Sequence, residues 1–237
     1  MRFGFKKMIL AFDTTLGTCS VALIQDGEVM SFSIKKIGRG HAEILFPMIE
    51  GVLKSVDKNL SEVDTLGVTV GPGSFTGVRV AISAAKGLSY GLKIPIKTVS
   101  SLEAITFEPL DNNSIKKGAQ IAAIVDARRG EVYAQRFKCT GHGLRLKTES
   151  EPEVISLEQL KIWGDYDFEM VVCSPTLGEE CFENWKLSNV IRTEPDARFI
   201  GKELESYKAK EGGFTLKPIY LRAPDAVKMK PHLGLEL

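Results

Sequence analysis

Short apolar runs separated by turn-forming residues open the chain. Residues 8–13 read MILAFD, an apolar run rich in strand formers that ends on an acid. TTLGT then indicates a turn and CSVALIQ a second strand, and the pair Asp26-Gly27 indicates a tight turn into a third strand, EVMSFSI. The pattern therefore predicts three antiparallel strands at the start of the molecule.

The following segments change to a helical spacing. Apolar residues recur three and four positions apart over residues 41–56, which predicts an amphipathic helix that Pro47 bends in its early turns. TLGVTV, residues 65–70, predicts a buried strand, residues 74–92 a second helix and residues 94–99 another strand. Small residues, Gly, Ala or Ser, lie on several faces of the second helix. They let another helix approach closely, so we expect this helix to be sandwiched in the fold or to form a subunit interface.

The second half of the chain repeats the opening pattern. AQIAAIVDARRGEVYAQRF, from residue 119, has an apolar strand, an acid, a glycine four residues later and a second strand. Asp126 and Gly130 thus correspond to Asp13 and Gly17 in the first half. Because each copy heads a half-chain, we interpret the pair as an internal duplication.

The remaining segments are assigned more coarsely. Residues 107–118 have a turn-rich composition and are the predicted boundary between two lobes, residues 1–112 and 113–237. Beyond a polar, weakly patterned stretch at 138–155, the pattern predicts a helix over SLEQLKIW, a strand at 168–174, a helix at 196–210 and an extended segment at PIYLR. The predicted fold class is α/β, with two duplicated lobes of mixed sheet plus helices, as in the actin-like ATPase fold.

Composition narrows the class of protein only slightly. Of the 237 residues 43% are hydrophobic and 26% charged, and 31 basic against 30 acidic residues leave a formal charge of +1. This balance does not indicate a nucleic-acid binder. The four cysteines show no zinc-type spacing, which is typical of buried thiols in a reducing compartment. The apolar run near the N-terminus stops at Asp13, too early for a signal peptide or a membrane span, so we expect a cytoplasmic protein.

The two hairpin turns carry the candidate chemistry. In an actin-like protein the acid of the first turn faces the phosphates and their metal ion, because a carboxylate holds metal-bound water. Asp13 and Thr14 offer an acid and a hydroxyl, and Arg128 in the second turn is placed to meet an anion. The alternative is structural: a strand end closed by an Asp-turn, and a solvated arginine.

The stretch VGPGSFTGVR, from Val70 to Arg79, is equally ambiguous. A glycine-rich loop before a helix is a potential anion site. It lacks the Lys-Ser/Thr ending of a P-loop, however, and its glycines are not spaced as GxGxxG, which favours a tight strand-to-helix turn capped by Ser74. The three histidines, His41, His142 and His232, are not paired at ligand spacing, so no His-rich metal site is expected.

Several motifs together resemble one family. ILAFDTTLGTCSVAL, HAEILFPMI, VTVGPGSFTGVRVAISAAKGLSYGLKIP, VDARRGEVYA and PIYLR occur in the order found in the TsaB (YeaZ) family. They cover most of the first half and anchor points of the second, whereas residues 140–195 match only loosely. The resemblance implies an actin-like fold and a role in making threonylcarbamoyladenosine beside the anticodon of tRNAs that read codons beginning with A.

The resemblance also implies partners. The TsaB family works as a scaffold or activating subunit for TsaD, the related catalytic subunit, together with the ATPase TsaE, while TsaC supplies the activated threonylcarbamoyl-adenylate. This chain would then contact tRNA only through the complex, and no membrane is involved. From the apolar surface of the two helices of the first half, we also expect the isolated chain to be a homodimer, in which TsaD replaces one copy.

Two departures from the catalytic relatives favour an inert subunit. TsaD has a His-x-x-x-His metal pair where this chain has Ser101 and Ile105, and Ile105 cannot bind a metal. TsaD also has a Ser-Gly-Gly nucleotide turn where this chain has Ser174-Pro175-Thr176. We therefore expect no catalytic residue, metal or cofactor, and a vestigial cleft at Asp13, Thr14 and Arg128. The alternatives are an active actin-like ATPase or kinase, and a metalloprotease, for which no HExxH motif is present.

The two helices of the first half are the predicted interface. The second has many small residues, and the first has apolar residues beyond the stripe that its own sheet would cover. We expect the pair to pack against the same pair of a partner as a bundle. The expected interface residues are His41, Ile44, Leu45, Phe46, Met48, Arg79, Ser83 and Lys86.

Overall fold

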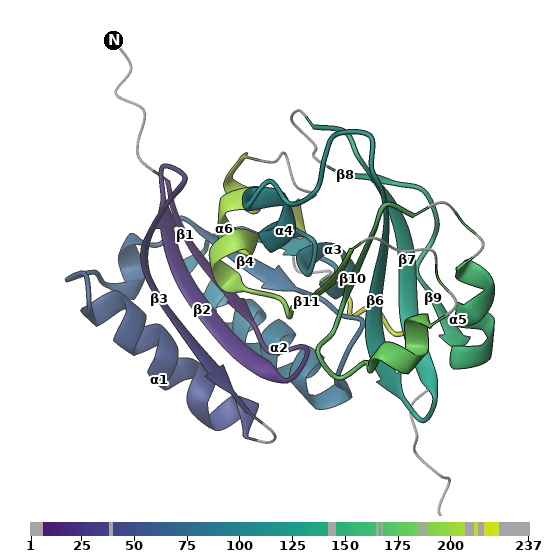
Figure 1. Ribbon diagram of the computed structural model, residues 1–237. Coiled ribbons are helices and arrows are strands. Elements are labelled where there is room, and N and C mark those ends of the chain that lie inside the picture. Colours follow the sequence, from purple (N-terminus) through teal and green to yellow (C-terminus); the bar gives the residue numbers. More distant parts are fainter. Residues whose placement is uncertain are drawn as a thin grey trace, which may run out of the picture.

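The strands form two mixed sheets (Figure 1). The computed structural model describes residues 7–37, 40–141, 146–164, 166, 168–183, 185, 189–206, 211–212 and 216–222. The first sheet has the order β12-β5-β4-β1-β2-β3, from β1 (Met8–Asp13), β2 (Thr18–Gln25), β3 (Glu28–Lys36), β4 (Thr65–Thr69), β5 (Ile96–Val99) and β12 (Glu211–Gly212). The second has the order β11-β10-β6-β7-β8, with β9 also on β7, from β6 (Gln120–Arg128), β7 (Glu131–Cys139), β8 (Leu146–Thr148), β9 (Glu153–Ser156), β10 (Met170–Cys173) and β11 (Val190–Arg192).

The two sheets repeat one topology. In the first, β1 and β2 form an antiparallel hairpin, and β4 and then β5 add in parallel beside β1. In the second, β6 and β7 form the hairpin, and β10 and then β11 add in parallel beside β6. The predicted duplication of a strand–hairpin–strand unit, and with it the predicted fold class, is confirmed.

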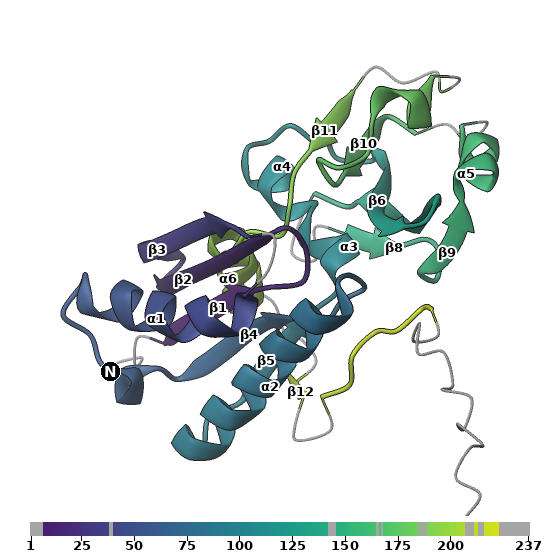
Figure 2. The same cartoon turned by 90° about the horizontal axis from the view of Figure 1, so that it is seen from below.

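Helices cover both faces of the first sheet. Along β1, Met8, Leu10 and Phe12 pack with α1 (His41–Lys54) and α2 (Phe75–Leu92), whereas Ile9 and Ala11 point to the other face, where α6 (Ala197–Ser206) packs. This alternation follows from the two-residue period of a strand. Figure 2 shows α1 and α2 on the outer face of the first sheet, away from the second sheet.

A single apolar core joins the sheets. It unites the inner face of β1 with α6, with the short helices α3 (Ser101–Ala104) and α4 (Phe107–Asp111), and with one face of β6. The opposite face of β6 packs with α5 (Leu157–Trp163) and the 3-10 helix η2 (Glu179–Phe182); a further 3-10 turn, η1 (Leu60–Glu62), precedes β4. Within the described residues, each helix is too short or too polar to cross a membrane.

Two short segments differ from the sequence-based expectations. Residues 107–118 begin as helix α4 rather than a loop, and Pro109 is tolerated there because it lies in the first turn, where no N–H partner exists. Residues 138–155 contain β8 and β9, whose three and four residues are too few to show a period and are stabilised by pairing with β7. The division at residue 112 stays a prediction; α6 and β12 follow the second sheet in the chain but pack on the first. The residues at 207–210 of the expected last helix, and most of the C-terminal tail, lie outside the described residues.

Candidate functional site

A cleft lies where the two hairpin turns face one another. Its volume is about 280 Å³. Leu16 and Gly17 of the first turn line it, as do Asp126 and Arg128 of the second. The remaining lining residues are Ile37, His41, Gly73, Ser74, Val125, Ala127, Tyr133, Ser174, Thr176 and Glu194. Arg128 therefore faces the cleft as expected, whereas Asp13 and Thr14 do not line it and are fully buried.

The Asp13 carboxylate is bound by its own neighbourhood. It accepts hydrogen bonds from the Thr15 amide, from Thr15 Oγ1 at 2.6 Å and from Thr69 Oγ1. Burial raises the pKa of Asp13 to about 7, even though the hydrogen bonds from Thr15 and Thr69 act to lower it. Thr14 donates its hydroxyl proton to the Gly77 carbonyl at 2.7 Å. Both side chains thus have structural partners inside the first lobe.

The glycine-rich loop packs against the first turn. The Ser74 amide donates to the Thr15 carbonyl at 2.8 Å, and the Gly77 amide donates to Ser74 Oγ, which caps α2. A Cβ at Gly73 would lie 2.4 Å from the Thr15 carbonyl oxygen, and one at Gly77 only 1.9 Å from that of Thr14. The glycines are therefore needed for close backbone approach, and two amides at the helix start are already engaged.

Ser101 and Ile105, which stand where the TsaD family has its metal pair, are buried in the fold. Ser101 Oγ donates to Thr15 Oγ1 at 2.9 Å, and Ile105 is fully buried in the core between the sheets. No group of three or more His, Cys, Asp or Glu side chains that could hold a metal ion occurs in the described part of the chain.

The second lobe gives the cleft an acidic wall. Ser174 Oγ accepts from the Asp126 amide at 3.0 Å and lies 3.3 Å from Thr176 Oγ1, so these hydroxyls hold the second turn. Glu194 Oε2 is buried without a hydrogen-bond partner, and its carboxylate lies beside Gly17. Arg128 forms an ion pair with Asp126 at 3.6 Å, so the carboxylate of Glu194 is the group in this cleft that disfavours a phosphate.

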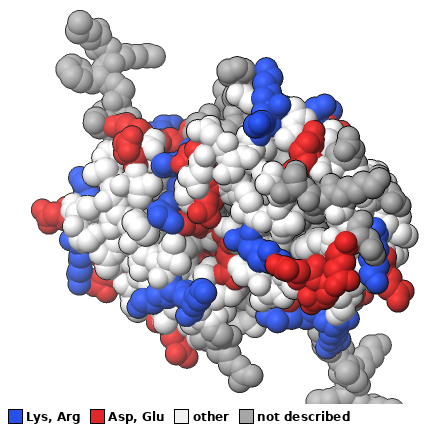
Figure 3. All heavy atoms as spheres, viewed as in Figure 1, with Lys and Arg blue, Asp and Glu red and all other residues white. Residues whose placement is uncertain are grey.

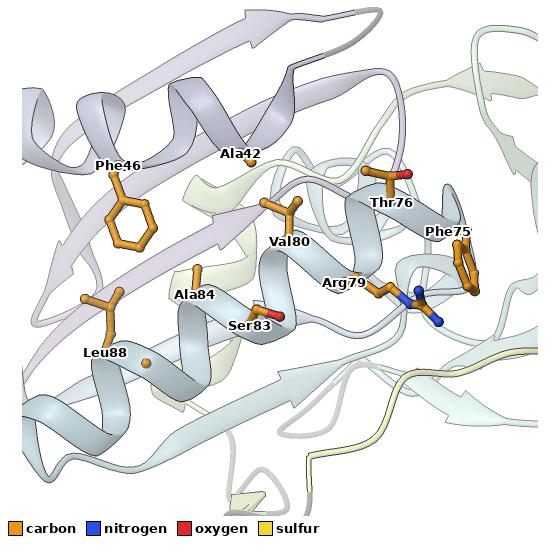
Figure 4. A pocket seen from close by; sticks show the side chains of 10 residues that line it. Ala42, Phe46, Phe75, Thr76, Arg79, Val80, Ser83, Ala84 and Leu88 are labelled. Atoms are coloured by element: carbon orange, nitrogen blue, oxygen red, sulfur yellow. The ribbon is translucent and has the colours of Figure 1, made fainter.

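A second, larger hollow lies between α1 and α2 (Figure 4). It has a volume of about 580 Å³ and is lined by Ala42, Phe46, Phe75, Thr76, Arg79, Val80, Ser83, Ala84, Gly87 and Leu88. We call it the groove. The Phe46 side chain is 51% exposed, and in Figure 4 it points from α1 toward the α2 residues of the groove.

The expected interface residues divide between the groove and the core. Phe46, Arg79 and Ser83 line the groove, and Lys86 is exposed on α2. Leu45 and Met48 are on the buried face of α1, and Ile44 is partly buried. His41 is buried and lines the cleft, with Nε2 at 3.2 Å from the Leu16 carbonyl oxygen. The expected set omits seven residues that line the groove: Ala42, Phe75, Thr76, Val80, Ala84, Gly87 and Leu88. Of these, Thr76, Val80, Ala84 and Leu88 recur every four residues, which places them on one face of α2.

The repeated sheet topology defines the class of protein: it is a member of the actin-like ATPase fold. A family model described as tRNA N6-adenosine threonylcarbamoyltransferase (TsaD) matches residues 35–163. The chain is 33% identical to the tRNA threonylcarbamoyladenosine biosynthesis protein TsaB of Escherichia coli (strain K12), over 67% of this chain and 68% of that protein. It is 30% identical to TsaB of Bacillus subtilis (strain 168), over 92% and 95%.

A solved structure agrees with these relatives. YeaZ from Pseudomonas aeruginosa superposes with a TM-score of 0.76 at 26% identity, covering 91% of this chain and all of that one. The chain belongs to the TsaB family of tRNA threonylcarbamoyladenosine biosynthesis proteins.

Proposed function

We propose that this chain is a non-catalytic scaffold and activating subunit for a TsaD-type transferase. The complex threonylcarbamoylates the adenosine next to the anticodon of tRNAs that read codons beginning with A. The single observation that carries the proposal is the contrast between the two hollows. The cleft is smaller, and the Asp13 carboxyl and the Ser74 amide beside it are engaged by internal hydrogen bonds, whereas the groove is larger, apolar and exposed.

The groove is the proposed docking site for the TsaD-type subunit. An exposed apolar hollow between two helices suits the apolar face of another helix, and the fold relation between the subunits supplies equivalent helices. In the isolated chain the same surface forms a symmetric homodimer, from which the TsaD-type subunit displaces one copy. A TsaE-type ATPase completes the complex, which works in the cytoplasm.

tRNA is contacted only through the complex. On the face shown in Figure 3, Lys and Arg side chains alternate with Asp and Glu side chains instead of forming one basic field. The formal charge of +1 for the whole chain supports the same conclusion. The cleft that Arg128 lines, with Asp13 and Thr14 buried outside its lining, is vestigial, and the chain uses neither a metal ion nor a cofactor.

Co-purification with the TsaD-type subunit of the same cell, followed by a tRNA modification assay, tests the proposal. Wild type should bind that subunit and be required for modification, and it should hydrolyse no ATP by itself. Ser83→Arg places a long cation in the groove and should abolish both binding and modification while the chain stays folded. Ile162→Arg, at a 63% exposed apolar residue on α5, is the matched control and should behave as wild type.

Two results would contradict this role. The first is modified tRNA made by this chain from threonylcarbamoyl-adenylate with no TsaD-type subunit present. The second is a folded Ser83→Arg variant that binds that subunit as well as wild type does.

A further inference from the structure

Two aromatic rings and one arginine form a cluster at one end of the groove. The Arg79 guanidinium carbon lies 3.6 Å above the Phe75 ring centroid, and Arg79 Nε donates to Tyr220 Oη at 3.1 Å. The two rings are 5.4 Å apart between centroids. Figure 4 shows Arg79 directed along α2 toward Phe75, at the end of the groove remote from Leu88. We call Phe75, Arg79 and Tyr220 the Arg79 cluster.

The backbone around Tyr220 holds it in place. The Ile219 amide donates to the Val70 carbonyl at 2.8 Å, and the Ile219 side chain packs against the core under α1 and α2. Arg222, two residues after Tyr220, donates to the Ala127 carbonyl at 3.2 Å. Tyr220 therefore lies between two anchored neighbours, and its hydroxyl is a fixed acceptor for Arg79.

Arg79 is the one charged residue among the ten that line the groove. Its Nε is engaged and one face of its guanidinium is covered, but no described residue accepts a hydrogen bond from its two terminal nitrogens. Two parallel N–H groups on a planar cation match the two oxygens of a carboxylate. Because the side chain is already ordered, binding an anion there costs little further conformational entropy.

We propose that the Arg79 cluster binds a carboxylate side chain, Asp or Glu, on the docking element of the TsaD-type subunit, and that Tyr220 is a positioning residue for Arg79. The inference rests on the proposed function, because it uses the same groove. The apolar residues supply buried area, and the single cation at one end fixes the direction and register of the partner helix. A partner helix inserted the opposite way round would leave its carboxylate against apolar side chains.

Calorimetric titration of the TsaD-type subunit into this protein at low and high salt tests the inference. Arg79→Met should weaken binding about tenfold at low salt and reduce the loss of affinity on adding salt. Tyr220→Phe keeps the ring but removes the acceptor, and should weaken binding about threefold. In the Arg79→Met background Tyr220→Phe should have no effect, since a positioning residue acts only through the residue that it positions. Lys138→Met removes an exposed cation from β7 and is the charge control, expected to bind as wild type.

The outcomes separate the inference from the proposed function. Wild type that fails to bind the TsaD-type subunit overturns both. Wild type that binds, together with an Arg79→Met variant of unchanged affinity and salt dependence, overturns the inference alone. If Tyr220→Phe reduced the affinity equally in the wild-type and Arg79→Met proteins, Tyr220 would not position Arg79, and only the contact of Arg79 with the partner would remain supported.

Discussion

The two hairpin turns begin with the same sequence pattern and end in different environments. In both, the acid at the strand end closes an Asp-turn: the Thr15 amide donates to Asp13, and the Arg128 amide donates to Asp126 at 2.7 Å. Asp13 is fully buried and is also bound by the hydroxyls of Thr15 and Thr69. The Asp126 side chain keeps 19% of its surface exposed and lines the cleft.

What packs over each turn explains the difference. In the first lobe β4 leads into the long helix α2, whose start presses against the backbone of Thr14 and Thr15. In the second lobe β10 leads only into the 3-10 turn η2, so the second turn stays open to the cleft. The long helix after β4 therefore coincides with a buried acid in the first turn, and the short 3-10 turn after β10 with a partly exposed acid in the second.

Replacing each acid by alanine is the strongest way to test this contrast. Asp13→Ala at pH 6 would leave two buried threonine hydroxyls and one amide without their acceptor, and should lower the free energy of unfolding by about 3 kcal/mol. Asp126→Ala should cost less than about 1 kcal/mol, because water can replace a partly exposed acceptor. Urea denaturation monitored by circular dichroism measures both. Similar losses for the two variants would show that the deeper burial of Asp13 does not give it a larger contribution to stability than Asp126 has.

The pH dependence of stability sharpens the same comparison. Burial raises the pKa of Asp13 to about 7, so the folded state holds a proton that the unfolded chain releases near pH 4. The unfolding free energy should therefore fall as the pH rises from about 4 to about 7. Asp13→Asn should remove about 1 kcal/mol per pH unit from that slope.

A second buried acid, Glu103, contributes to the pH dependence of the unfolding free energy in every variant. Burial, and then the neighbouring Glu203, raises the pKa of Glu103 to about 7 as well. Denaturation curves at pH 5, 6, 7 and 8 should thus show a reduced but persistent slope for Asp13→Asn, and the wild-type slope for the control Asp126→Asn. A wild-type slope in Asp13→Asn would mean that Asp13 is charged throughout this range.

Local sequence predicted both turns but not their environments. The two apolar runs with the Asp-x-x-x-Gly spacing between them predict a hairpin, because this signal is local in the sequence. The burial of Asp13 depends on Thr69, 56 residues away, and on the placement of α2, which no local period encodes. The same limit applies to the groove. The helices of the groove were predictable, but the rotation that turns Leu45 and Met48 inward and Phe46 outward depends on the packing with the sheet.

The smallest expected effect concerns the backbone of the second turn. Arg128, Arg129 and Gly130 all have positive φ, with 66° at Arg128, a conformation that costs a residue with a side chain about 1 kcal/mol. The first turn lacks this feature among its residues. The Arg128 side chain is 77% exposed and its ion pair with Asp126 is 3.6 Å long, so little stability depends on its charge.

Arg128→Gly should therefore stabilise the fold by about 0.5 kcal/mol, since relief of the positive φ slightly exceeds the extra entropy of glycine in the unfolded chain. Arg128→Ala is the matched control: it removes the charge without relieving the backbone, and should be neutral or slightly destabilising. Neither change should alter binding to the TsaD-type subunit, because the groove lies on the other lobe. Thermal melts and titration calorimetry measure the two quantities. A destabilised Arg128→Gly variant would show that the Arg128 side chain contributes to stability. A loss of partner binding in Arg128→Ala would show that this side chain contributes to binding.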